Sequence, residues 1–194
     1  MPESLSNEER IAVYNALATL FLIEPNKNLL EVLKEGAKHL PFGLSKLGDC
    51  IDEYKDLDEA KKEIGAEYIK AFYSMSANPI SLYESVHTSD EGLVKQEAYD
   101  KMKEFIEEEN LELTGLDSLM LDHVSVELMC MAKLLGDEIG SKEQQKSQDF
   151  FTSHINNWMP GLFDEILQKE FSGFYSAAAL AAKEFLMSEE SIYA

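Results

Sequence analysis

Arginine is almost missing from this sequence, in which Arg10 is the only arginine among 17 basic residues. Acidic residues number 37, so the formal net charge is −20. A surface of this charge repels nucleic acid and anionic lipid and attracts cationic partners. The acidic excess would also serve solubility alone. We therefore expect no nucleic-acid partner, whereas the choice between a cationic partner and simple solubility stays open.

Cysteine is scarce, and no segment is typical of export or of membrane insertion. Cys50 and Cys130 stand alone, without CxxC or Cys/His spacing, which indicates free thiols in a reducing cytoplasm. Residues 1–10 lack the basic n-region and the apolar h-region of a secretory signal. No apolar run approaches the roughly 18 residues needed to cross a membrane. We expect a soluble, cytoplasmic protein that does not insert directly into a membrane.

Strand patterns are also missing, whereas apolar residues recur at helical spacing along the chain. Ser6 and Glu9 form the pattern of a capping box, which predicts a first helix ending at Glu24-Pro25. Asp58 is predicted to cap a helix that extends to residue 72. Further helices are predicted at residues 28–38, 44–54, 91–109, 119–135, 142–158, 162–168 and 173–186. The chain is therefore predicted to be one all-α domain, residues 1–194, a single globular bundle of about eight or nine helices.

Residues 74–90 do not fit the helical pattern. Asn78, Pro79 and several serines break the periodicity, while Ile80, Leu82 and Tyr83 keep the stretch apolar. A long loop in a compact domain is usually functional or disordered, and this apolar content argues against disorder. The stretch is predicted to be an ordered connector that lies across a groove.

Residues 119–135 are almost continuously apolar, which predicts a helix buried on most of its surface. Asp122, His123 and Glu127 interrupt this run, and buried groups of this kind need a partner. His123 and Glu127 stand one helical turn apart, and a carboxylate beside an imidazole raises its pKa, so His123 is expected to be cationic near neutral pH. Either the three residues satisfy one another in the core, or they face a cleft.

Glu84 and His87 form an ExxH pair, which suggests an alternative. Two such motifs on paired helices are typical of di-metal carboxylate bundles, but only one is present. The alternative function is a metal-dependent helical-bundle enzyme that uses Glu84, His87, His123 and Glu127. No nucleophile elbow, dinucleotide fingerprint or P-loop is present. A binding protein without a catalytic, metal or cofactor site is the preferred prediction.

Charge placement points to a kind of partner. Eight carboxylates and no lysine or arginine lie between Lys103 and Lys133, and no lysine or arginine lies between Lys70 and Lys95. These two stretches also hold most of the candidate site residues. An acidic, aromatic-lined groove suits a peptide that is basic at one end and apolar along the rest, which is the composition of a twin-arginine export signal.

Four motifs, in order along the chain, resemble the TorD/DmsD/NarJ family of chaperones. Residues 67–72 (EYIKAF) resemble its (D/E)Yxx(L/A)F segment, and residues 83–87 (YESVH) resemble its (Y/W)ESVY segment. Residues 121–129 (LDHVSVELM) resemble its DHLxxEL signature. Residues 151–160 resemble its FxxxHLxxWxP helix, and an FY pair follows at residues 174–175. The family has Glu-Pro where residues 120–121 are Met-Leu, and tyrosine where His87 stands.

The resemblance implies an all-helical, TorD-like fold and a cytoplasmic chaperone. Such a chaperone binds the twin-arginine signal peptide of the apo catalytic subunit of a molybdenum-containing oxidoreductase, and it assists assembly and cofactor insertion before export. Carboxylates would receive the guanidinium groups, and aromatic rings would contact the apolar region. The predicted peptide-binding residues are Tyr68, Phe72, Tyr83, Glu84, Ser85, His87, Asp122, His123 and Glu127.

Overall fold

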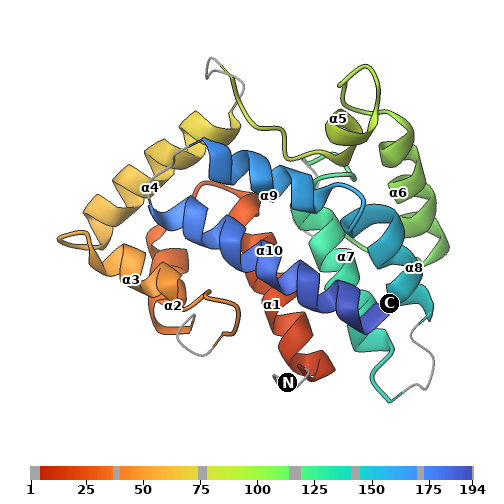
Figure 1. Cartoon of the computed structure of the whole chain (residues 1–194), viewed down its shortest axis with the longest axis horizontal. Coiled ribbons are helices and arrows are strands. Elements are labelled where there is room, and N and C mark those ends of the chain that lie inside the picture. The colour runs from red at the N-terminus through yellow and green to blue at the C-terminus, as the bar shows by residue number, and fades with distance from the viewer. Residues whose placement is uncertain are drawn as a thin grey trace.

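The structure is a computed structural model that describes residues 5–36, 40–73, 78–113, 119–140, 145–169 and 173–193 (Figure 1). Within these ranges it contains ten α-helices, one π-helical segment and a single isolated β-bridge, so the all-α prediction is confirmed. In chain order the elements are α1 (Asn7–Leu22), α2 (Lys27–Gly36), α3 (Lys46–Asp52), α4 (Leu57–Phe72), α5 (Glu84–Thr88), α6 (Glu97–Glu108), α7 (Val124–Asp137), α8 (Gln145–Phe150), the π-helix η2 (Phe151–Ile155), α9 (Met159–Gln168) and α10 (Gly173–Tyr193).

Two predicted helix starts are wrong, each for a local reason. The cap of α4 is Asp56 and not Asp58, because the Asp56 side chain accepts the backbone N–H groups of Asp58 and of the residue after it. The helix predicted from residue 91 begins at Glu97, because Gly92 and Lys95 adopt positive φ angles that a helix does not tolerate. The capping box predicted at the start of α1 is present.

The helix predicted at residues 142–158 is divided into two kinds of helix. After α8 the backbone widens into the π-helix η2, and a new α-helix, α9, begins at Met159. Single π-turns of this kind are rare and are often found at functional sites. Parts of three predicted segments, residues 37–38, 74–77 and 142–144, lie outside the described residues. The described remainder of the connector predicted at 74–90 has no regular secondary structure apart from the bridge residue Tyr83 and the short helix α5.

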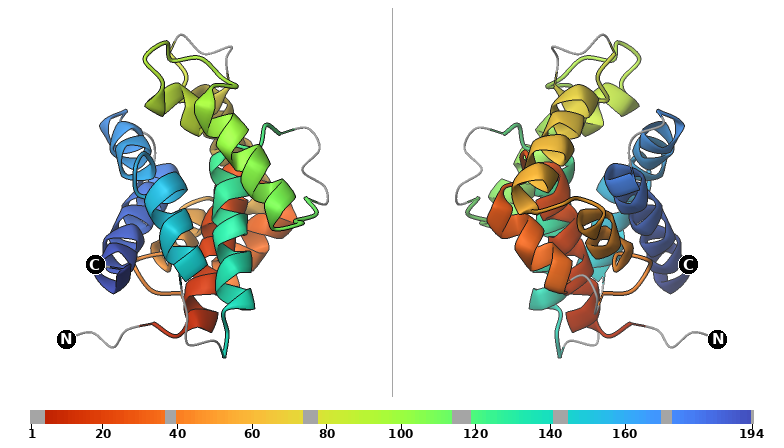
Figure 2. Two further views of the ribbon diagram at one scale, coloured as in Figure 1. Left: turned by 90° about the vertical axis from the view of Figure 1, so that its right-hand side faces the viewer. Right: turned by 90° about the vertical axis from the view of Figure 1, so that its left-hand side faces the viewer.

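The centre of the fold is the pair α1 and α7, which pack along each other. In the two side views α9 and α10 lie on one side of this pair (Figure 2). Ala178, Ala179 and Ala182 of α10 are fully buried, and their small side chains allow close approach of neighbouring helices. α4 lies at one end of the molecule, and α5 with α6 lies at the other (Figure 1).

A buried ion pair joins the two ends of the chain. Arg10 of α1 donates to both carboxylate oxygens of Glu189 in α10, at 2.7 and 2.8 Å, and both side chains are almost fully buried. The hydroxyl of Tyr14 donates to the same carboxylate at 2.9 Å, and Tyr193 accepts another Arg10 N–H. The only arginine of the sequence therefore fixes α10 to α1 and is not part of a surface patch.

Neither cysteine is bridged, and none of the described helices is both long and apolar enough to cross a membrane. Cys130 is buried in α7, and this burial raises the pKa of its thiol to about 12. At neutral pH the thiol stays protonated and packs as a small apolar group.

Candidate functional site

The segments that precede α5 and α7 lie side by side. Tyr83 and His123 form the isolated antiparallel bridge, and the backbone N–H of Glu84 donates to the carbonyl oxygen of Asp122 at 2.9 Å. This pairing holds His123 in extended backbone, directly after a turn that contains Asp122, so α7 begins only at Val124. The prediction that a helix begins at residue 119 and contains both residues is therefore wrong.

His123 is the N-cap of α7. Its Nδ1 accepts the backbone N–H of Ser125 at 3.1 Å, which requires an unprotonated Nδ1. Burial lowers the pKa of the imidazole to about 4, so the expectation of a cationic His123 near neutral pH is wrong. The predicted pairing with Glu127 is also wrong, because the His123 side chain bonds Ser125, whereas the Glu127 carboxylate bonds Trp158. The Tyr83 and His123 rings meet edge to face, with centroids 5.0 Å apart.

Asp122 binds the first turn of α5. Its Oδ2 accepts the backbone N–H of Ser85 at 3.0 Å, and the hydroxyl of Ser85 accepts the backbone N–H of Gln96 at 3.1 Å. Asp122 and Ser85 are fully buried. These bonds connect the segment before α7 to α5 and then to the start of α6, so both side chains hold the walls of the site in place.

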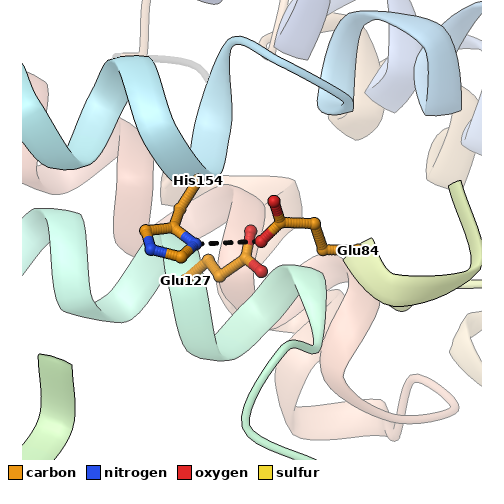
Figure 3. A group of neighbouring side chains, drawn as sticks. All are labelled: Glu84, Glu127 and His154. Carbon is orange, nitrogen blue, oxygen red and sulfur yellow. Dashed lines mark hydrogen bonds and ion pairs between the residues drawn. The ribbon is translucent and has the colours of Figure 1, made fainter. Parts of the chain in front are cut away.

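Behind this bridge, Glu84, Glu127 and His154 converge from α5, α7 and η2 (Figure 3). His154 Nδ1 lies 2.9 Å from Glu84 Oε2, and Asn157 donates to Glu84 Oε1 at 2.9 Å. The indole N–H of Trp158 donates to Glu127 Oε2 at 2.9 Å. Burial, with the neighbouring carboxylate of Glu84, raises the pKa of Glu127 well above its usual range. Glu127 therefore faces Glu84 and Trp158 and does not brace His123.

The ligand set of the alternative metal-dependent enzyme is not assembled. His87 Nε2 bonds the backbone carbonyl of Ser81 at 2.8 Å, and its ring packs on the indole of Trp158 with centroids 5.2 Å apart. His123 caps α7 through its Nδ1. The group that could hold a metal ion within the described ranges contains Glu84 and Glu127, but its imidazole is that of His154.

An apolar pocket lies on one side of the bridge. It has a volume of about 440 Å³. Tyr68, Phe72, Tyr83 and His123, four of the predicted site residues, line it. Its other walls come from Leu22, Tyr73, Pro79, Ser81, Leu82, Val94 and Leu119. A hollow of this size and lining suits apolar side chains.

A polar pocket lies on the other side, with a volume of about 380 Å³. Glu84 lines it together with Asp90 and Glu97, which are exposed. The other lining residues are Thr88, Ser89, Gln96, Ala98, Lys101, Ser153 and Asn157. Glu97 also pairs with Lys101 at 2.8 Å, one helical turn away on α6. The acidic residues outnumber the single lysine, so the pocket favours a cationic group.

Sequence reasoning missed three residues of the buried cluster: His154, Asn157 and Trp158. All three lie in the FxxxHLxxWxP-like segment, which was recognised as a motif but was not connected to the site. The signal was the motif itself, since its histidine and tryptophan carry the polar atoms that reach Glu84 and Glu127. Asp90 and Glu97 lie outside the motifs found in the sequence, so no signal pointed to them.

Comparisons with known proteins agree over most of the chain. Residues 33–164 match the family described as nitrate reductase delta subunit. The chain is 24% identical to the chaperone protein TorD of Photobacterium profundum over 193 residues, which cover 89% of this chain and 88% of the relative. It is 24% identical to TorD of Shewanella piezotolerans over 190 residues, 89% and 86% of the two chains. A solved structure from Archaeoglobus fulgidus, assigned to redox enzyme maturation, has the same fold, with a TM-score of 0.60, 21% identity and coverage of 92% and 93%.

Proposed function

Because the chain belongs to the nitrate reductase delta subunit family, we propose that it binds the N-terminal twin-arginine signal region of a molybdenum-containing oxidoreductase. The predicted resemblance to the TorD and NarJ chaperones is confirmed at the level of the family. The chain is thus a chaperone of redox-enzyme maturation and not an enzyme. The twin-arginine region, the molybdenum enzyme and the cytoplasm as the place of action belong to the proposal.

One observation carries the proposal: two consecutive residues line two pockets of opposite character. Tyr83 lines the apolar pocket, and Glu84 lines the polar, acidic pocket. A peptide that crosses this segment meets carboxylates on one side and aromatic rings on the other. A twin-arginine signal has that order of chemistry, an arginine pair followed by an apolar region.

The arginine pair would occupy the polar pocket. Guanidinium groups bind carboxylates through two parallel hydrogen bonds, and Asp90 and Glu97 offer carboxylates that are open to solvent. Glu84 is almost fully buried and already bonds His154 and Asn157, so it would form the floor of the pocket. The formal net charge of −20 would steer a cationic peptide to this face, with rates that fall as salt rises.

The apolar region would enter the other pocket. Phe72 and Tyr83 are half-buried, and Tyr73 at the rim is 53% exposed, so these rings have surface left to cover. Full burial of a leucine-sized side chain contributes about 1.5–3 kcal/mol. A few such side chains would add substantially to the contribution of the arginines.

The remaining predicted residues would act behind the walls. Ser85, Asp122 and Glu127 are fully buried, and His87 packs on Trp158. They would hold α5 and the bridge in position, so their loss would weaken binding indirectly. The protein needs only reversible affinity for the signal, stronger in the immature client than in the assembled one, to delay export until the cofactor is inserted.

Isothermal titration calorimetry with a synthetic twin-arginine peptide tests the proposal. We expect one peptide to bind per chain, with affinity that falls at least about tenfold when both arginines are replaced by lysine, because lysine cannot form the bidentate bond. A peptide whose apolar residues are replaced by serine is expected to bind weakly as well. Equal affinity for the original and the lysine peptide would refute the arginine assignment.

Paired protein variants locate the binding face. Asp90→Asn with Glu97→Gln is expected to weaken binding of the twin-arginine peptide about tenfold, because both acidic groups of the open pocket lose their charge. Glu8→Gln with Glu31→Gln removes the same number of exposed charges from α1 and α2 and is the matched control. Equal weakening by both pairs would mean that overall charge, and not the pocket, attracts the peptide.

A further inference from the structure

Three potential metal ligands lie together inside the fold, on three separate elements. Glu84 of α5, Glu127 of α7 and His154 of η2 each offer one donor atom, and these atoms all lie within 4.8 Å of one another. The three residues are 3%, 0% and 6% exposed. Carboxylates are almost never fully buried without a partner, so two in one enclosed site require an explanation.

The carboxyl groups of Glu84 and Glu127 can satisfy each other only by sharing a proton or a cation; burial and hydrogen bonding to Glu84 through such a proton both raise the pKa of Glu127. Glu127 Oε2 accepts the Trp158 indole N–H, but the described residues give Glu127 Oε1 no hydrogen-bond partner. Figure 3 shows the Glu127 carboxylate directed toward that of Glu84. Two carboxylate oxygens both accept hydrogen bonds, so a proton or a cation must lie between them.

We propose that Glu84, Glu127 and His154 bind one divalent first-row transition metal ion, with Zn²⁺ as the probe that suits them best. Two carboxylates and a 2+ ion form a neutral group, which removes the cost of burying charge. The imidazole selects a transition metal over Mg²⁺ or Ca²⁺, which prefer oxygen ligands. This site shares Glu84 with the polar pocket, but it is inferred from the positions of the ligands and not from the proposed peptide binding, and it implies no catalysis.

The distances are compatible with such an ion. His154 Nδ1 and Glu84 Oε2 are 2.9 Å apart. Two ligands of one tetrahedral Zn²⁺ lie about 3.4 Å apart, given bonds of about 2.1 Å, so small side-chain rotations suffice to bring the third donor into place. Binding would replace the hydrogen bond between His154 and Glu84 with a bond from each to the metal.

The surroundings already orient the donors. The Trp158 indole holds Glu127, and the Asn157 amide holds the other oxygen of Glu84. Such outer contacts are typical of metal sites, where they fix the direction of each ligand. The π-turn of η2 carries His154, and irregular turns of this type are frequent at functional sites.

The polar pocket supplies a route for the ion. Glu84 and Asn157 line that pocket and also belong to the buried cluster, so the pocket reaches the cluster at these two side chains. The exposed carboxylates of Asp90 and Glu97 at the same pocket would attract a cation toward it. A bound ion would connect α5, α7 and η2 directly behind the bridge.

Calorimetric titration of the chelator-treated full chain with ZnCl₂, at physiological salt, tests the site. We expect one ion per chain, bound more tightly than Mn²⁺ and much more tightly than Mg²⁺, and a higher melting temperature with Zn²⁺. Glu127→Gln is expected to lower Zn²⁺ affinity at least about tenfold and to abolish the thermal shift. Its amide oxygen can still accept the Trp158 N–H, and circular dichroism checks that the variant is folded.

Glu31→Gln is the matched control, because Glu31 is an exposed glutamate of α2 that lines neither pocket. It should leave the stoichiometry and the affinity within about twofold of the unmodified chain. Glu84→Gln removes a second ligand and should lower Zn²⁺ affinity as much as Glu127→Gln does. It replaces Glu127→Gln in the test if that variant is unfolded. The proposal is overturned by absence of saturable Zn²⁺ binding, by equal affinity for Mg²⁺, or by unchanged binding in both cluster variants.

Discussion

Replacing His123 with asparagine isolates one buried titration at the centre of the site. His123 Nδ1 accepts the Ser125 backbone N–H at the start of α7. Asparagine is among the best N-cap residues, and its side-chain oxygen can accept the same N–H group. The variant His123→Asn therefore keeps the cap and removes only the group that titrates.

The size of the effect follows from the two pKa values of the imidazole. Burial places the folded pKa at about 4, against 6.5 for the exposed group. Between these values the folded chain binds fewer protons than the unfolded chain, so the free energy of unfolding falls as pH falls. The full difference corresponds to about 3 kcal/mol, of which about 2 kcal/mol is lost between pH 7 and pH 5.

Urea unfolding followed by circular dichroism, at several pH values across this range, measures the effect. We expect His123→Asn to gain about 2 kcal/mol relative to the unmodified chain on going from pH 7 to pH 5, because only the unmodified chain loses this contribution. Taking the difference between the two chains cancels all other titrations. A difference that stays constant with pH would refute the conclusion that His123 is buried in its neutral form.

Three further predictions concern other buried or capping groups. Burial raises the pKa of Glu127, so above pH 4.5 the folded state of metal-free protein binds more protons than the unfolded state. The free energy of unfolding therefore falls as pH rises. In urea unfolding at several pH values, Glu127→Gln should make this fall smaller. Glu189→Gln should cost about 3–5 kcal/mol, measured by the same method, because it leaves Arg10 buried without its counter-charge. Ser6→Ala should cost about 1 kcal/mol by breaking the capping box of α1, and a change below a few tenths would contradict that cap.

Local patterns in the sequence predicted the helices well. Apolar spacing located all the long helices, and the capping box at Ser6 and Glu9 was read correctly. Such features depend on residues three or four positions apart, which a sequence displays directly. Predicted helix boundaries were wrong where a single residue changes the backbone conformation. Lys95 is an example, because its positive φ means that α6 begins only at Glu97.

The start of α7 could not be predicted from local pattern. Residues 119–135 contain no proline or glycine, so nothing in the sequence breaks the helix before Val124. Asp122 and His123 leave the helix because their backbone pairs with the segment before α5, and their side chains bond Ser85 and Ser125. Such long-range pairing is invisible in a single sequence.

The sequence predicted part of the grouping of residues at the candidate site, and their role in peptide binding stays a prediction. Tyr68, Phe72, Tyr83 and His123 were predicted together and line one pocket. His154 was not connected to the predicted site because it stands 70 positions after Glu84 in the sequence. Burial was not foreseen either, since Asp122 and Glu127, two carboxylates among the predicted peptide-binding residues, are fully enclosed. The exposed acidic residues of the polar pocket are instead Asp90 and, on α6, Glu97, which were not among the predicted site residues.

Photo-crosslinking of a bound twin-arginine peptide tests the central claim most directly, because it reports which pocket each end of the peptide occupies. A photoreactive residue beside the arginine pair is predicted to label the polar pocket, near Asp90 and Glu97. The same group within the apolar region is predicted to label the aromatic pocket, near Phe72 and Tyr73. Labelling outside both pockets, or identical labelling from both positions, would contradict a peptide that spans the two sides of the bridge.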